Sequence, residues 1–180
     1  EHPQGRGGEG GAGGIGIDHH DRHVGRRDRA ENGPWSAGIP GLPAAFDGYR
    51  VLQLSDIHAS RLLTGDWVRR VVDDSNALKP DLIVITGDLI DGSVEARRED
   101  ARPLADLHAP DGVIAITGNH EYYAQYQDWM QAFRALHMQV LENSHMQVRR
   151  GDAALTIAGV TDPVAARYGL PLPDLDAALA

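Results

Sequence analysis

The feature that most constrains the fold is a set of three short apolar runs, each about the length of a β-strand. They cover residues 51–54, 82–85 and 113–116, and Val, Leu and Ile dominate them. Short continuous apolar runs are typical of strands that are buried on both faces of a parallel sheet. Segments with helical spacing separate the runs. The sequence therefore predicts an α/β fold in which parallel strands are joined by crossover helices.

The rest of the chain beyond residue 49 can be divided by the same patterns. Pro103 interrupts the second expected helix, because proline cannot donate a hydrogen bond inside a helix, and Asp174 is the expected N-cap of a short last helix. The expected elements are strands at 50–54, 82–86, 112–117 and 138–141, helices at 67–78, 93–107 and 125–137, and a hairpin of 145–149 with 154–158.

The amino-terminal part differs from this pattern. Residues 1 to about 33 are rich in glycine and charge, and residues 34–43 are rich in proline and glycine. Such a segment buries too little apolar surface to offset the entropy of ordering its backbone. We expect residues 1–45 to form a disordered tail and connector, and residues 46–180 to form one domain.

Composition excludes several classes of function. The chain has 180 residues, no cysteine and a formal net charge of −9, so disulfides, thiolate nucleophiles and cysteine zinc sites are excluded. An acidic chain repels a phosphate backbone, and no nucleic-acid-binding surface is expected. No run approaches the roughly 20 apolar residues of a membrane-spanning helix. Membrane association is expected only through sequence missing from this chain, which leaves a cytoplasmic or membrane-peripheral location open.

Polar motifs follow the three apolar runs directly. The carboxyl ends of parallel strands meet at one edge of the sheet, where α/β proteins bind ligands. Carboxylate, imidazole and amide groups gathered there would suit a pair of divalent metal ions. The motifs are Asp56-Ile57-His58, Gly87-Asp88 and Gly118-Asn119-His120-Glu121.

Each motif also has a simpler interpretation when it is taken alone. Asp56 and Asp88 could be turn residues, and Asn119 could cap a helix. Asp91, which precedes Gly92, fits a turn aspartate well and is not counted in the site. In an extended chain, side chains two apart point the same way, so Asp56 and His58 can reach one ion. Three motifs in order, each after its own strand, favour a metal site.

This order of motifs resembles the calcineurin-like metallophosphoesterases over roughly residues 42–179, and the residues after Glu121 look like those of a bacterial phosphodiesterase or phosphohydrolase branch. The resemblance implies the amino-terminal part of an α/β/β/α sandwich. It also implies roles. Asp56 and His58 would bind a first metal, Asp88 would bridge, and Asn119 would bind a second. His120 would protonate the leaving group, and Glu121 would hold its ring.

The implied function is hydrolysis of a phosphate ester with two divalent ions, such as Mn, Fe or Zn, and a metal-bound hydroxide. The family's later histidine and its Gly-His-x-His motif have no counterpart before Ala180. We therefore expect a chain truncated before these motifs. The alternative is a non-catalytic module that binds a metal or a partner without turnover. A dinucleotide-binding domain is disfavoured, because no Gly-x-Gly-x-x-Gly follows the first strand.

Overall fold

The computed structural model describes residues 36–180. Of the predicted disordered tail and connector, residues 1–45, the part up to residue 35 lies outside the described residues, and the boundary between tail and domain stays a prediction. The first element is a single helical turn, η1 (Ala44–Phe46), which buries Phe46. From there the chain leads directly into the first strand.

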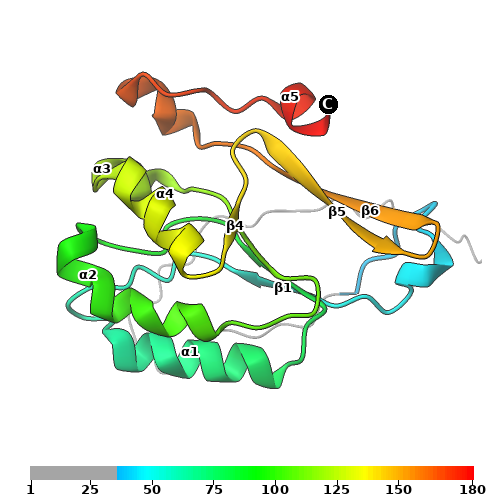
Figure 1. Ribbon diagram of the computed structural model, residues 1–180, viewed down its shortest axis with the longest axis horizontal. Helices are drawn as coiled ribbons and strands as arrows, with labels where there is room; N and C mark the ends of the chain where they lie inside the picture. The colour runs from blue at the N-terminus through cyan, green and yellow to red at the C-terminus, as the bar shows by residue number, and fades with distance from the viewer. Residues whose placement is uncertain (1–35) are drawn as a thin grey trace, which may run out of the picture. The chain divides into compact units, whose positions relative to one another are not determined.

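A four-stranded parallel sheet forms the centre of the described part (Figure 1). Neighbouring strands are paired in parallel in the order β1-β2-β3-β4, with Val51 opposite Leu82 and Ile83 opposite Val113. This pairing confirms the predicted α/β class. The strands are β1 (Val51–Leu54), β2 (Leu82–Ile85), β3 (Val113–Ala115) and β4 (Gln139–Val140).

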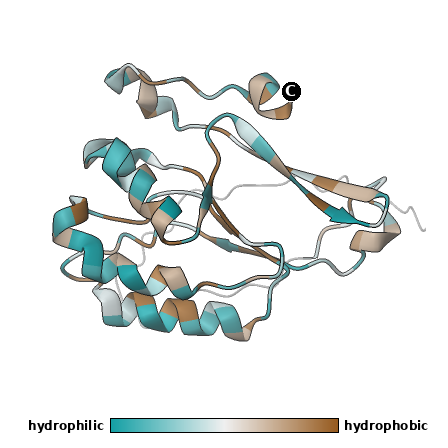
Figure 2. Ribbon diagram, in the orientation of Figure 1, coloured by the Kyte–Doolittle hydropathy of each residue, from teal (hydrophilic) through white to brown (hydrophobic). Residues whose placement is uncertain are grey.

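Alternation along β2 divides its side chains between two apolar layers. Ile83 and Ile85 pack in the larger apolar cluster, to which the helices also contribute side chains. Leu82 packs in a smaller apolar cluster with Ile114 and Leu141. The two faces of a strand carry alternate residues, so a continuous apolar run is needed where both faces are covered. Figure 2 shows brown stretches in the central strands, and both teal and brown stretches in the helices beside them.

Helices pack on the sheet with their apolar faces inward. Helix α1 buries Val68, Val71 and Val72, which recur at helical spacing on one face. The second predicted helix is divided just before Pro103, which takes a position in the first turn of the following 3₁₀ helix, where no backbone donor is needed. The segments are α1 (Gly65–Ala77), α2 (Val94–Ala101), η2 (Arg102–Asp106), α3 (Asn119–Tyr123) and α4 (Tyr126–Ala135).

The carboxyl-terminal part supplies the second layer. Strands β5 (Ser144–Arg150) and β6 (Ala153–Gly159) form the predicted antiparallel hairpin, and Met146 and Ile157 pack on the smaller cluster. They are followed by η3 (Pro163–Tyr168) and α5 (Leu175–Leu179), which Asp174 caps by accepting a hydrogen bond from the Ala177 amide. Between residues 36 and 180, no helix is both long and apolar enough to cross a bilayer.

Candidate metal centre

The loops after β1 and β2 run side by side beyond the ends of the strands. The amide of His58 donates to the carbonyl of Asp88 (2.9 Å), and the amide of Asp91 donates to the carbonyl of Ala59 (2.9 Å). Ala59 and Ile90 form a parallel bridge, and both are buried. The sheet register therefore continues into the loops and fixes the polar side chains of one loop against those of the other.

Three of these polar residues adopt left-handed backbone conformations. The φ angles are 54° at Asp56, 46° at His58 and 53° at Asp88. Our expectation of an extended chain between Asp56 and His58 is therefore wrong, because both residues have positive φ, although their side chains still lie close together. Non-glycine residues with positive φ are uncommon, and such strained backbone is concentrated at functional sites.

Two glycines let the loop after β2 touch the loop after β3. A Cβ atom on Gly118 would lie 2.2 Å from Asp88 Oδ1, and one on Gly87 would lie 2.2 Å from the Gly118 nitrogen. Any side chain at either position would force these loops apart. The close approach lets Asp88 Oδ1 accept a hydrogen bond from the backbone amide of His120 (2.9 Å).

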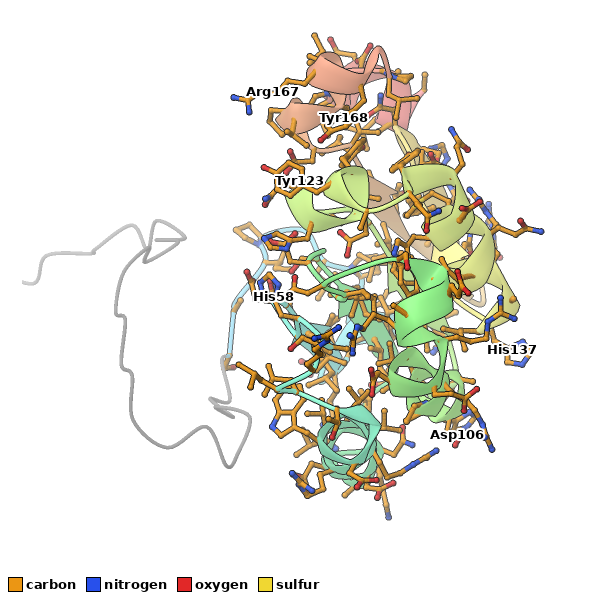
Figure 3. All side chains as sticks on the ribbon, turned by 90° about the vertical axis from the view of Figure 1, so that its left-hand side faces the viewer. His58, Asp106, Tyr123, His137, Arg167 and Tyr168 are labelled. Carbon is orange, nitrogen blue, oxygen red and sulfur yellow. The ribbon has the colours of Figure 1, made fainter. Side chains whose placement is uncertain are left out.

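Asp56, His58 and Asp88 form the first group that could hold a cation. His58 Nε2 lies 3.7 Å from Asp56 Oδ1 and 3.9 Å from Asp88 Oδ2. Ligand atoms that share one ion at about 2.0–2.2 Å each lie roughly 3–4 Å apart, so the spacing fits. The donor set, two carboxylates and one imidazole, suits a divalent ion. In Figure 3 the labelled His58 lies at one side of the molecule.

A second group joins His58 and His120 through Asp91. His58 Nδ1 lies 2.9 Å and His120 Nδ1 lies 2.6 Å from the same atom, Asp91 Oδ1. These separations are those of hydrogen bonds and are short for atoms that share an ion. An ionised carboxylate only accepts hydrogen bonds, so each Nδ1 carries the proton. The other ring nitrogen, Nε2, takes no part in these hydrogen bonds and is the atom through which each ring could bind a metal or exchange a proton.

The contacts of Asp91 correct its assignment as an ordinary turn residue. Partial burial raises the pKa of Asp91, but hydrogen bonds and the charge of His58 and His120 outweigh burial and hold this pKa below its usual value. A sequence signal existed. Leu89 and Ile90 between Asp88 and Asp91 are fully buried, and two apolar residues between carboxylates indicate a loop anchored in the core.

Glu121 has different contacts from those expected. Its side chain is 1% exposed and accepts hydrogen bonds from the amides of Asp88 (3.1 Å), Leu89 (2.8 Å) and Gly118 (2.8 Å). Burial raises the pKa of Glu121, and the three amide donors oppose that rise. The expectation that Glu121 holds the His120 ring is wrong, because Asp91 makes that contact. Glu121 instead ties the loop after β2 to the loop after β3.

Asn119 is the first residue of α3, and Gly118 takes the N-cap position that we had considered for it. Its two neighbours both touch Asp88, through the Gly118 backbone and the His120 amide. Asn119 is half-buried. The structure thus places it beside the other predicted ligands, and its role as a ligand remains a prediction.

The later histidines lie away from this cluster. His145 Nδ1 is 2.8 Å from the carbonyl oxygen of Ala178, in the contact of the hairpin with α5. His137 is exposed after α4, and Figure 3 shows it on the side of the molecule opposite His58. Within residues 36–180 the imidazoles of the candidate centre are therefore those of His58 and His120.

Comparison with known proteins gives a consistent result. The profile of the family described as calcineurin-like phosphoesterase matches residues 49–168. A transmembrane protein with a metallophosphoesterase domain from Danio rerio is 35% identical over 67% of this chain and 29% of its own length. Uncharacterized metallophosphoesterases of Helicobacter pylori and Aquifex aeolicus are 30% and 32% identical over 72% and 67% of the chain. The chain spans 34% and 45% of the length of these two relatives.

Proposed function

Because the chain belongs to the calcineurin-like phosphoesterase family, we propose that it hydrolyses phosphoric ester bonds with the help of divalent metal ions. The observation that carries this proposal is the convergence of Asp56, His58, Asp88, Asp91 and His120 at the carboxyl edge of the parallel sheet. The bound substrate would be a phosphate ester, and we leave open whether it is a monoester or a diester.

Asp56, His58 and Asp88 would hold one ion, and Asp88 and Asn119 would hold a second. Asp88 fits the bridging role because Oδ2 faces His58 while Oδ1 faces the start of α3. Carboxylate, amide and imidazole donors are compatible with Mn, Fe or Zn. When bound, a pair of such ions neutralises charge on the phosphate oxygens and lowers the pKa of a water molecule.

His120 would transfer a proton to the leaving group. Its Nδ1 proton is held by Asp91, and therefore Nε2 is the atom that can carry a proton to the departing oxygen. The hydrogen bond to Asp91 fixes the orientation of the His120 ring that this step requires. Asp91 acts through His120 and His58, so we assign it as a positioning residue.

Glu121 would support the site without touching the substrate. Three backbone amides around Asp88 and Gly118 converge on its carboxylate. Loss of these hydrogen bonds would release Asp88 and Asn119 from their present separation. We therefore reassign Glu121 from a catalytic to a positioning residue.

A second function is supported by the ligand set itself. The described residues offer one imidazole, His58, to an ion beside the two carboxylates, whereas the resemblance implies further histidines. The alternative is a module that binds a metal or a partner without turnover. Membrane association and location also stay proposals, because the only observation on the chain itself is the lack of a spanning helix within residues 36–180.

Hydrolysis of p-nitrophenyl phosphate and bis(p-nitrophenyl) phosphate by the purified chain, with and without Mn²⁺ or Zn²⁺, tests the proposal. Metal-dependent release of nitrophenol is expected, and it should be lost in Asp88→Asn. The matched control is Asp152→Asn, an exposed aspartate in the turn of the hairpin. Metal binding without hydrolysis would contradict the enzyme and support the non-catalytic module.

A further inference from the structure

We propose that Tyr123 and Tyr168 form a subsite that binds an aromatic ring in the leaving group of the phosphate ester. This inference rests on the proposed function and adds a substrate class to it. The ring would stack on the exposed faces of the two tyrosines, beside the histidine that we assign to the leaving group.

The exposure of the aromatic residues first points to this surface. Most aromatic side chains of the described part lie in the core, including Phe46, Trp129 and Phe133 at 1% exposure each. The exposed ones are Tyr123 (55%) and Tyr168 (48%). These two belong to α3 and η3, which contact each other. Single exposed apolar residues are common on protein surfaces, whereas grouped ones mark binding sites. Two large exposed rings on neighbouring elements therefore indicate a binding surface.

The position of Tyr123 connects this surface to the candidate metal centre. The ring of Tyr123 lies 5.5 Å from the ring of His120 at an interplanar angle of 57°. The His120 ring in turn lies 4.5 Å from the His58 ring. Figure 3 shows Tyr123 between His58 and Tyr168 along one side of the molecule. Tyr123 is therefore placed on the His120 side of the centre, where the leaving group would depart.

The exposed Tyr168 packs on a buried aromatic residue, Tyr122. Tyr122 is 3% exposed, stacks on Tyr126 with 4.4 Å between centroids and shares a hydrogen bond with Thr117 (3.1 Å). Tyr168 contacts Tyr122 with 6.0 Å between centroids. Tyr123 follows Tyr122 directly in α3. The buried Tyr122 thus helps to hold the Tyr168 ring in place, which reduces the entropy lost when a ligand ring binds there.

The chemistry of the surface favours a ring over a charged or extended group. Asp56, Asp88 and Asp91 make the metal centre acidic, and its bound ions would take the phosphate. The adjoining tyrosines offer apolar faces, which stack on other rings at centroid distances of about 4.5–7 Å. An aryl phosphate, whose ring is joined directly to the ester oxygen, matches a ring position next to His120.

The test compares two phosphonates that cannot be hydrolysed, phenylphosphonate and methylphosphonate, on the chain loaded with Zn²⁺. Calorimetric titration should give tighter binding of phenylphosphonate by roughly 5- to 100-fold, the range that ring stacking gives. Tyr123→Ala and Tyr168→Ala should each reduce this ratio, while the affinity for methylphosphonate stays unchanged and reports an intact metal centre. Tyr123→Phe keeps the ring and should keep the ratio.

Arg167→Gln is the matched control, because Arg167 is an exposed neighbour of Tyr168 on η3. It changes charge without removing a ring, so the ratio should remain at the value of the unaltered chain. A second pair of ligands, uridine 5′-monophosphate and ribose 5-phosphate, is compared in the same titration. The first carries a base ring that a sugar separates from the phosphate, and the second lacks the ring. Selectivity in that pair but not between the phosphonates would contradict a ring beside His120.

The outcomes separate this inference from the proposed function. Equal binding of the two phosphonates overturns the aromatic subsite and leaves the metal centre standing. A phenyl preference that survives both alanine variants overturns the assignment to these tyrosines. A chain that binds neither phosphonate overturns the proposed function and the subsite together.

Discussion

The two edges of the parallel sheet both carry aspartates, but the aspartates are compensated in different ways. At the amino edge, Asp111 accepts two hydrogen bonds from the Arg150 guanidinium (2.5 and 3.1 Å) and one from the Tyr49 hydroxyl (2.7 Å). At the carboxyl edge, Asp56, Asp88 and Asp91 meet imidazoles and backbone amides.

The difference separates an edge whose aspartate is paired within the fold from the edge at which we propose the chemistry. The guanidinium of Arg150 holds the pKa of Asp111 below its usual value, and this pair joins β3 to the hairpin. At the carboxyl edge the carboxylates converge on histidines whose Nε2 atoms remain available. Charge that lacks a fixed cationic partner is suited to bind a cation from solution. The following substitutions should therefore separate the two edges.

The largest effect is expected from Asp88→Asn at the carboxyl edge. The substitution keeps the size of the side chain but removes the charge that bridges the two proposed ions. Metal content should fall, and the rate of hydrolysis should fall to that of the chain treated with a chelator. Metal analysis after dialysis and a hydrolysis assay measure this. Unchanged metal content would place the ions elsewhere.

The next largest effect is expected from His120→Ala. Bound metal should remain, and the rate should fall by about 10²–10⁴, the usual contribution of general acid–base catalysis. The loss should be smaller for p-nitrophenyl phosphate than for phenyl phosphate, since nitrophenolate leaves without needing a proton. An equal loss for both substrates would contradict the role of His120 as the acid.

A smaller effect at the same edge is expected from Asp91→Asn. The carboxylate that accepts hydrogen bonds from His58 and His120 is replaced by an amide, while the size of the side chain is kept. Activity or metal affinity should fall about 10–100-fold, as is usual when the partner of a metal-binding histidine is removed. Steady-state kinetics and metal titration measure this. An effect no larger than that of Asp152→Asn would return Asp91 to its first assignment as a turn residue.

The smallest effect on chemistry is expected at the amino edge, from Asp111→Asn. The unfolding temperature should fall by roughly 2–6 °C, and the activity of the folded chain should be kept. Because the pKa of Asp111 is lower in the folded state, its stabilisation is complete above the unfolded value of about 4 and is lost as pH falls through the folded value.

The difference in unfolding temperature between the unaltered chain and Asp111→Asn should therefore be largest near neutral pH and shrink in acid. Thermal unfolding followed by circular dichroism between pH 3 and 7 measures it. A loss of activity at full stability in this variant would remove the distinction between the two edges.

The fold could be predicted well from the sequence because its signals are local. The apolar runs at 51–54, 82–85 and 113–116 predicted the strands, and helical spacing predicted α1. The interruption at Pro103 was also expected from the missing backbone donor. Strands β2 and β3 were expected to end at residues 86 and 117, but they end at Ile85 and Ala115. The chain leaves the sheet at these points to form the loops of the candidate site.

The site could be predicted only in part, because its contacts depend on the register between loops. The convergence of Asp56, His58, Asp88 and His120 was expected from the strands that they follow. The partner of His120 was not, because Asp91 reaches it through a parallel bridge between residues 59 and 90. The burial of Glu121 likewise follows from the approach of Gly87 to Gly118, which no local pattern encodes.

The most direct test of the account is ¹⁵N NMR of the imidazoles during titration of the chain with Zn²⁺. We predict that His58 binds the ion through Nε2 and keeps its Nδ1 proton on Asp91, while His120 keeps both nitrogens free of metal. In Asp88→Asn, Zn²⁺ should no longer change the ¹⁵N signal of His58 Nε2. Binding through Nδ1 of both His58 and His120 would contradict the account, because it would place the ion where we assign a hydrogen-bonded carboxylate.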